Sequence, residues 1–164
     1  MEQQQQALRV TKGEPVFQEE GFMESVLIVD PEGAVHEQLE QTLHDLFVLR
    51  HARTAAEALD AIGRQRPNLI ISEVDLPDRT GLELCEWLRA NTPTARIPIL
   101  LLTSRAEIND KVAGFLAGAD DYVVKPIDPR FFSSRIRLLF RLKALEPPGN
   151  GSSSHSSGPP SPRS

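Results

Sequence analysis

Five short, continuously apolar runs, separated by longer stretches with helical periodicity, constrain the fold of this chain more than any other feature. They occupy residues 26–29, 47–49, 69–71, 97–102 and 122–124. A strand is apolar throughout when helices cover both faces of a parallel sheet, whereas a half-exposed strand alternates apolar and polar residues. The pattern therefore predicts five strand–helix units, which right-handed crossovers assemble into an open α/β sandwich.

Each stretch between the runs begins with a helix start signal. Three have a hydroxyl residue followed three positions later by glutamate, as in the capping box, in which both side chains bond exposed backbone N–H groups. Two have aspartate followed by proline, which suits an N-cap and the first helical position. The expected N-caps are Asp30, Thr54, Thr80, Ser104 and Asp128.

Composition divides the chain into one folded domain and two tails. Residues 1–24 are rich in Gln and Glu, and residues 147–164 consist mostly of Pro, Gly, Ser and Asn. Such segments bury too little apolar area to offset the entropy lost on ordering. We predict disordered tails at 1–24 and 147–164, and a folded domain at 25–146.

Charge and cysteine content exclude several classes of protein. A formal net charge of −5 argues against coating nucleic acid or an anionic membrane. The single cysteine, Cys85, excludes an internal disulfide and a multi-cysteine metal site. The apolar runs are too short to cross a bilayer, and residues 1–10 are glutamine-rich where a signal peptide is apolar. We expect a cytoplasmic protein with no nucleic-acid and no membrane partner.

Polar residues follow four of the apolar runs, namely Asp30, Glu73, Thr103 and Lys125. In an open parallel sheet, ligands bind outside the carboxyl ends of the strands, so these side chains should meet at one edge. Two carboxylates, a hydroxyl and an ammonium can hold a hard cation and a phosphoryl group. Taken singly, each is equally an ordinary residue of a strand end or a solvated surface.

Four segments resemble the receiver domain (CheY-like) of two-component response regulators: residues 26–30, 76–77 with Gly81, 101–104 and 118–126. The resemblance covers 25–145 and implies a flavodoxin-like α/β open sandwich, with five parallel strands in the order 2-1-3-4-5. It further implies that an aspartate after the third strand accepts a phosphoryl group from a histidine kinase. Mg²⁺ is then held by that aspartate and by an acidic pair after the first strand.

The resemblance also implies roles for particular residues. Asp30 matches the first acid of the pair, and the main-chain carbonyl of Asp75 matches a metal ligand. Thr103 and Lys125 match the hydroxyl and the lysine that grip the phosphate. Tyr122 matches the aromatic residue that swings inward when the signal passes to the face formed by the fourth helix, fifth strand and fifth helix.

Two positions depart from the family pattern. Glu73 stands where the accepting aspartate is expected, and Pro31 replaces the second acid of the pair. The extra methylene moves the carboxylate by roughly 1.3 Å, and a misplacement of about 1 Å costs on the order of a hundredfold in rate. With the metal ligands reduced to Asp30, Glu73 and Asp75, Mg²⁺ binding should be weak or lost, although Glu32 is placed to substitute.

We therefore predict an atypical pseudo-receiver with no catalytic residue, held near one conformation and acting by protein contact. In one alternative, Glu73, or Asp75 in a shifted register, is still phosphorylated by a histidine kinase or a small phosphodonor. In another, the chain is a phosphate- or nucleotide-binding enzyme, although Gly33 stands alone where a glycine-rich loop is needed. Glu73 is either a relic paired with Lys125 or a partial mimic of the phosphorylated state that also reaches Thr103.

The fourth and fifth helices supply the expected partner face. Val112 and Phe115 lie at helical spacing among charged residues of the fourth helix, Tyr122 lies on the strand between, and Arg135 and Arg137 lie on the fifth helix. An acidic and apolar surface beside a basic one suits a signalling protein partner or a homodimer. Basic residues without interleaved aromatic ones do not make a nucleic-acid site.

Overall fold

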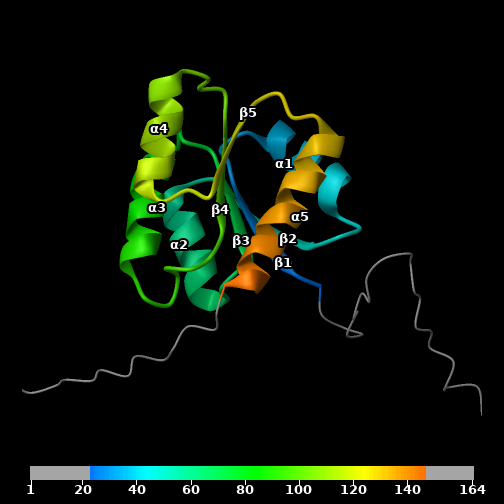
Figure 1. Ribbon diagram of the computed structural model, residues 1–164, viewed down its shortest axis with the longest axis horizontal. Coiled ribbons are helices and arrows are strands. Elements are labelled where there is room, and N and C mark those ends of the chain that lie inside the picture. Colours follow the sequence, from blue (N-terminus) through cyan, green and yellow to red (C-terminus); the bar gives the residue numbers. More distant parts are fainter. Residues whose placement is uncertain (1–22, 147–164) are drawn as a thin grey trace, which may run out of the picture.

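The computed structural model describes residues 23–146, in which strands and helices alternate strictly along the chain (Figure 1). The strands are β1 (Ser25–Val29), β2 (Val48–Ala52), β3 (Leu69–Ser72), β4 (Ile99–Thr103) and β5 (Asp121–Val124). The helices are α1 (Gly33–Leu43), α2 (Ala55–Arg64), α3 (Gly81–Ala90), α4 (Ile108–Ala117) and α5 (Pro129–Leu145). The predicted tails lie outside the described residues, apart from Met23 and Glu24.

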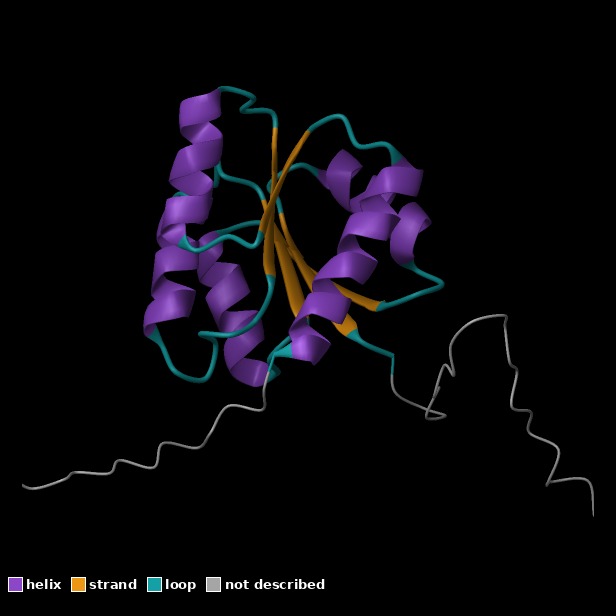
Figure 2. Ribbon diagram, in the orientation of Figure 1, coloured by secondary structure: helices purple, strands orange, loops and turns teal. Residues whose placement is uncertain are grey.

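The strands form one parallel sheet in the order β2-β1-β3-β4-β5, which confirms the predicted topology. Helices α1 and α5 cover one face, and α2, α3 and α4 cover the other (Figure 2). Alternate residues of β1 enter different cores: Ile28 packs with the α1 and α5 side, whereas Leu27 packs with the α2–α4 side. Both faces of the strand are therefore buried, which is why its sequence is apolar throughout.

The edge strand β2 differs from its prediction. The apolar run 47–49 predicted a buried strand, but β2 runs from Val48 to Ala52 and is buried only at Ala52. Phe47 instead precedes the strand and packs in the core beside α1 and α5. Within residues 23–146, β2 pairs with β1 alone, so this edge strand tolerates polar residues. One of them, Arg50, donates to the carbonyls of Ala61 and Gln65 at the end of α2.

Three of the five expected N-caps are confirmed. Thr54 and Thr80 accept hydrogen bonds from the backbone N–H groups three residues later, at 3.0 and 3.1 Å. Asp128 accepts from the N–H of Arg130 at 3.0 Å, with proline at the start of the helix as expected.

The N-caps expected at Ser104 and Asp30 are wrong. Helix α4 has Glu107 as its N-cap, and α1 has Glu32, neither with a side-chain cap bond. In the segment after β4, the side chain of Arg105 bonds Asp75 and its carbonyl accepts from Tyr122, and the helix begins only at Ile108. Asp30 lies two residues before the N-cap of α1, where its carboxylate bonds the N–H of Glu32 and the ammonium of Lys125.

Gly81 allows α3 to begin directly against the end of β3. A Cβ at this position would lie 2.3 Å from the carbonyl oxygen of Glu73, a backbone atom that cannot yield. The N–H of Gly81 donates to the carbonyl of Val74 at 2.7 Å, which closes the loop after the strand. Among the helices of residues 23–146, none has the length and apolar character that a bilayer crossing requires.

Candidate functional site

The carboxyl ends of β1, β3 and β5 bring Asp30, Glu73 and Lys125 into one cluster, as the sequence predicts. The Nζ atom of Lys125 lies 2.8 Å from Oδ2 of Asp30 and 2.7 Å from Oε2 of Glu73. Thr103, at the end of β4, is fully buried at the same edge, but its Oγ1 accepts from the N–H of Arg105 at 3.4 Å. We call Asp30, Glu73 and Lys125 the lysine cluster.

Glu73 uses both of its carboxylate oxygens. While Oε2 accepts from Lys125, Oε1 accepts from the backbone N–H groups of Val74 at 2.8 Å and Asp75 at 3.1 Å. The side chain is thus folded back along its own main chain, and the residue is only 6% exposed. The extra methylene of glutamate is accommodated by this bend, which holds the carboxylate inside the cluster.

Asp30 is held from three directions. Its Oδ1 accepts from the N–H of Glu32 at 2.8 Å, its Oδ2 accepts from Lys125, and its main-chain carbonyl accepts from Nε2 of His36 at 2.7 Å. Pro31 follows with neither a side-chain oxygen nor an N–H, and the side chain of Glu32 is exposed. The position after Asp30 therefore contributes no carboxylate to the cluster.

The lysine cluster keeps its ammonium charged. Burial acts against the charge, but the hydrogen bonds from Lys125 to Asp30 and Glu73 outweigh it, so the pKa of Lys125 is raised above its ordinary value. One positive charge, on a side chain that is 15% exposed, therefore lies between two buried carboxylates.

These residues fit Mg²⁺ poorly. Mg²⁺ requires several oxygen ligands in near-octahedral geometry, yet both carboxylates already have an oxygen committed to Lys125. Pro31 adds no ligand, so the main-chain carbonyl of Asp75 is the one oxygen of the expected set that does not come from Asp30 or Glu73. Across residues 23–146, no group of three or more His, Cys, Asp or Glu side chains is placed to hold a metal ion.

A second ion cluster lies beside the first and was missed by the sequence analysis. Arg105 binds both carboxylate oxygens of Asp75, with Nε 2.8 Å from Oδ2 and Nη2 2.7 Å from Oδ1, and its Nη1 lies 3.7 Å from Oδ1 of Asp110. The hydrogen bonds from Arg105 hold the pKa of Asp75 below its ordinary value. We call these three residues the arginine cluster; its only sequence signal was a charged residue just after the fourth strand.

Tyr122, the predicted switch residue, points inward. It is 6% exposed, its hydroxyl donates to the carbonyl of Arg105 at 2.8 Å, and burial raises the pKa of the phenol. The ring packs closely over Gly114 of α4, where a Cβ would lie 2.8 Å from a ring carbon. The arginine cluster and the aromatic ring are thus joined through Arg105.

Of the five residues predicted for the partner face, Tyr122 is buried and the other four are accessible. Val112 and Phe115 of α4 are 48% and 51% exposed, although both are large and apolar. Arg135 of α5 lies 3.7 Å from Asp121 of β5, and Arg137 is exposed on the same helix. Exposed apolar side chains therefore occur on α4, and basic ones on α5, as the sequence predicts.

The chain is similar in sequence to a known protein family and to several of its members. The family model described as the response regulator receiver domain matches residues 26–137. The chain is 37% identical over 118 residues to the transcriptional regulatory protein GltR of Pseudomonas aeruginosa, covering 71% of this chain and 49% of GltR. It is 38% identical over 122 residues to the response regulator MprA of Mycobacterium ulcerans, covering 74% of this chain and 52% of MprA. The chain thus spans about half the length of these curated relatives.

The same similarity is found among solved structures. A response regulator from Chloroflexus aurantiacus superposes with a TM-score of 0.71 at 36% identity, covering 73% of this chain and 99% of that one.

Proposed function

Because this chain belongs to the response regulator receiver domain family, we propose that it is an atypical receiver that acts by protein contact, without stable phosphorylation at Glu73. Receiver domains are modules of two-component signalling that interact with histidine kinases and other signalling partners; they are not conventional enzymes. The observation that carries the proposal is the closed lysine cluster, in which the residue at the accepting position already has both oxygens bound.

Phosphorylation of Glu73 would require the cluster to open. An attacking oxygen must be free and in line with the phosphorus atom, and an error of about 1 Å lowers the rate on the order of a hundredfold. Glu73 would have to give up its bond from Lys125 or the two bonds from its own main chain. Hydrogen bonds to charged groups contribute about 1.5–3 kcal/mol each, so the open form is costly.

Weak Mg²⁺ binding is part of the same proposal. In the family chemistry that the resemblance implies, the metal neutralises charge on the phosphoryl group, a task for which Lys125 alone is a poor substitute. Pro31 removes one ligand, and the ammonium already satisfies the two acids that remain.

Glu73 acts in this proposal as a charge partner for Lys125 rather than as a full mimic of a phosphoryl group. Its carboxylate bonds Lys125 and the local backbone, while Thr103 bonds Arg105 instead. A phosphoryl group would supply about −1.5 to −2 charges and three oxygens, enough to reach both residues at once. The cluster therefore favours one fixed conformation, with Tyr122 inward.

The partner in this proposal is a signalling protein or a second copy of the chain, bound at the α4–β5–α5 face. Val112 and Phe115 supply apolar area, and Arg135 and Arg137 supply positive charge. Fully buried apolar centres with charged rims are typical of protein interfaces. A partner surface with an apolar pocket and acidic rim would complement this composition.

The decisive experiment is intact-protein mass spectrometry after incubation with Mg²⁺ and acetyl phosphate. We expect no phosphoryl adduct on the wild-type chain, and a labile adduct on the P31D/E73D double variant, which restores both acids. The single E73D variant shows whether the acceptor alone suffices. A wild-type adduct contradicts the proposal, and its loss in D75N would assign it to Asp75. Mg²⁺ binding by the double variant is measured separately by titration. If the double variant does not bind Mg²⁺, residues other than Pro31 and Glu73 also prevent metal binding.

A second experiment addresses the partner face. The chain is used as bait for cross-linking in its native cell, alongside V112A/F115A. Trp87→Ala is the matched control, because Trp87 is a 42% exposed aromatic residue on α3. We expect the α4 variant to lose capture and the α3 variant to retain it; the reverse would move the interface off the α4–β5–α5 face.

A further inference from the structure

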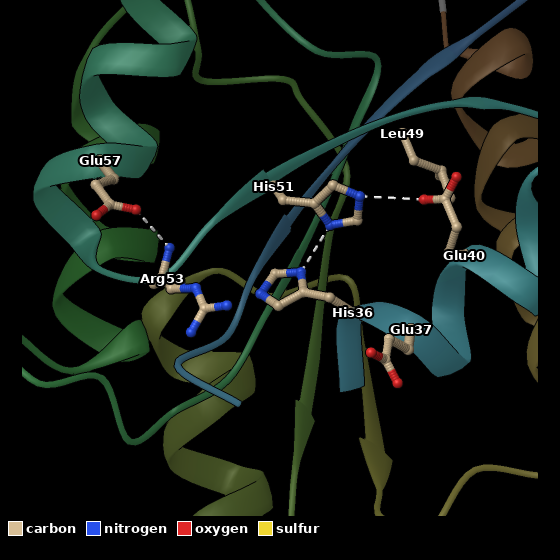
Figure 3. A pocket seen from close by; sticks show the side chains of 7 residues that line it. All are labelled: His36, Glu37, Glu40, Leu49, His51, Arg53 and Glu57. Carbon is tan, nitrogen blue, oxygen red and sulfur yellow. Dashed lines mark hydrogen bonds and ion pairs between the residues drawn. The ribbon is translucent and has the colours of Figure 1, made fainter. Parts of the chain in front are cut away.

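Two histidines from different elements meet at the edge of the sheet away from the lysine cluster's ammonium. His36 lies in the first turn of α1, and His51 lies on the edge strand β2. Their Nδ1 atoms are 2.7 Å apart, and the rings meet at an interplanar angle of 73° with centroids 4.7 Å apart. Figure 3 shows the two Nδ1 atoms turned toward each other. The sequence separation of 15 residues gave no sign of this pairing.

The outer nitrogen of each ring is held by an oxygen. Nε2 of His36 bonds the main-chain carbonyl of Asp30 at 2.7 Å, and Nε2 of His51 lies 3.1 Å from Oε2 of Glu40. Histidines that bind metals almost always donate the outer ring N–H to a carbonyl or a carboxylate, which fixes the ring and raises the basicity of the other nitrogen. Both rings in this pair have that support.

The inner nitrogens already offer one lone pair. A hydrogen bond between two Nδ1 atoms needs one protonated nitrogen and one that accepts, so one ring directs a lone pair at the other. Nε2 of His36 must donate to the carbonyl of Asp30, since a carbonyl only accepts. The single proton between the rings is therefore the group that a metal ion would replace.

We propose that His36 and His51 bind one late first-row divalent metal ion, Zn²⁺ or Cu²⁺, through their Nδ1 atoms. Zinc–nitrogen bonds of about 2.0–2.1 Å in tetrahedral geometry place two ligand nitrogens about 3.3 Å apart. The two Nδ1 atoms must separate by about 0.6 Å to reach that spacing, and the rings must turn so that both lone pairs point at the metal rather than along the line between the nitrogens. His51 is free to make this movement, because its side chain is 38% exposed on an edge strand.

The surrounding groove favours a cation. It is lined by His36, Glu37, Glu40, Leu49, His51, Arg53 and Glu57, which set three carboxylates against one guanidinium (Figure 3). Since no third His, Cys, Asp or Glu in residues 23–146 completes the set, water would fill the remaining coordination positions. A two-histidine site of this kind binds Cu²⁺ more tightly than Zn²⁺, following the general order of divalent affinities.

This site touches the lysine cluster only through the bond from His36 to the main-chain carbonyl of Asp30, and its metal chemistry differs from that of the proposed function. Imidazole nitrogens select Zn²⁺ and Cu²⁺, whereas Mg²⁺ takes oxygen ligands. A failure of the histidine site would leave the behaviour of Glu73 unaffected, and phosphorylation of Glu73 would not bear on the histidines.

The test is isothermal titration of the untagged full chain with Zn²⁺ at neutral pH in the presence of excess Mg²⁺. We expect one bound Zn²⁺ per chain and at least tenfold weaker binding by H51Q, with folding of the variant checked by circular dichroism. The matched control is H44Q/H155Q, which removes the two other histidines of the sequence and should leave the affinity unchanged. Absence of binding by the wild-type chain, or binding that survives H51Q, overturns the proposal.

A pair of glutamate variants separates orientation from charge. E40Q weakens the hydrogen bond to His51 and should reduce Zn²⁺ affinity by about 10–100-fold, as for other oxygen partners of metal-binding histidines. E37Q removes the same charge from the same groove and should reduce it only a few-fold. Because Cu²⁺ is paramagnetic, it should also selectively broaden the NMR signals of His36 and His51. Equal weakening by the two variants, or broadening centred elsewhere, would contradict the assigned ligands.

Discussion

Two neighbouring clusters in this protein have the same composition and opposite burial. In each, one cation lies between two carboxylates: Lys125 between Asp30 and Glu73, and Arg105 between Asp75 and Asp110. The side chains of the lysine cluster are 15%, 3% and 8% exposed, whereas those of the arginine cluster are 50%, 56% and 31% exposed. The two clusters are therefore matched in charge and differ most in their access to solvent.

The difference in exposure implies that the three charges of the lysine cluster depend on one another, whereas those of the arginine cluster form ordinary surface contacts. Removing one partner of a buried ion pair leaves an uncompensated charge in a poorly solvated site, while water replaces a lost partner at the surface. The lysine cluster should therefore resist any change that unbalances its charge, including the entry of a cation or a phosphoryl group. The arginine cluster can exchange partners at little cost.

The largest expected effect comes from removing the buried cation. Lys125→Met keeps the length of the side chain but leaves Asp30 and Glu73 buried near each other without a counter-charge. We expect the free energy of unfolding to fall by about 3–5 kcal/mol, measured by urea denaturation at pH 7. A loss below about 1 kcal/mol would mean that water already reaches the cluster.

A neutral version of the cluster provides the control for this prediction. The triple variant D30N/E73Q/K125M removes all three charges while keeping side-chain size. Because no charge is then left unpaired, it should recover most of the stability that K125M loses. If the triple variant is as unstable as K125M, lost packing around Lys125 explains the effect and the charge argument fails.

Glu73→Gln should have an intermediate effect. The amide oxygen can still accept from the N–H groups of Val74 and Asp75, but the amide NH₂ then faces the ammonium of Lys125. Lys125 loses one acceptor and keeps Asp30, so we expect a loss of about 1–3 kcal/mol in urea denaturation. The matched control is E86Q, an exposed Glu→Gln change on α3, with little expected effect.

Alkaline pH should reduce the difference in unfolding free energy between wild type and K125M. The pKa of Lys125 is raised above its ordinary value of 10.5 in the folded protein. A raised pKa contributes stability that is fully present below the unfolded value and is lost as pH rises through the folded one. The difference in unfolding free energy between wild type and K125M should thus be constant up to about pH 10 and shrink above it. A constant difference to higher pH would show that the ammonium is not the stabilising species.

The sequence predicted the lysine cluster because its members follow apolar runs, and parallel strands bring their carboxyl ends to one edge. The strand order and the burial of β1, β3, β4 and the middle of β5 came from the same pattern and from the family resemblance, which leaves the position of Tyr122 open. The pattern did not predict that the Glu73 side chain bends back onto its own backbone, because side-chain direction depends on the conformation of the local loop. The roles of these residues in phosphate and metal binding stay predictions.

The features that the sequence did not predict lie in loops and at the edge strand β2. Ser104 fits a capping box by residue type, but α4 begins only at Ile108, after a segment in which Arg105 contacts Asp75 and Tyr122. The contact between His36 and His51 depends on the register of an edge strand that begins later than its apolar run. Long-range contacts between polar side chains leave no periodic signal in a sequence.

The smallest expected effect comes from Arg105→Gln. Arg105 bonds both oxygens of Asp75, yet the two side chains are about half exposed, so water can replace either partner. We expect urea denaturation at pH 7 to show far less loss than for K125M. The hydrogen bonds from Arg105 depress the pKa of Asp75 below its ordinary value of 3.8. The stability that this pair contributes is therefore fully present above pH 3.8 and is lost as pH falls through the pKa of Asp75 in the folded protein. NMR titration of the Asp75 carboxyl should therefore show its pKa rising toward 3.8 in R105Q, while Tyr122 keeps its backbone acceptor at residue 105. A stability loss comparable to that of K125M would show that exposure does not separate the two clusters, because a pair half open to water would then behave like a buried one.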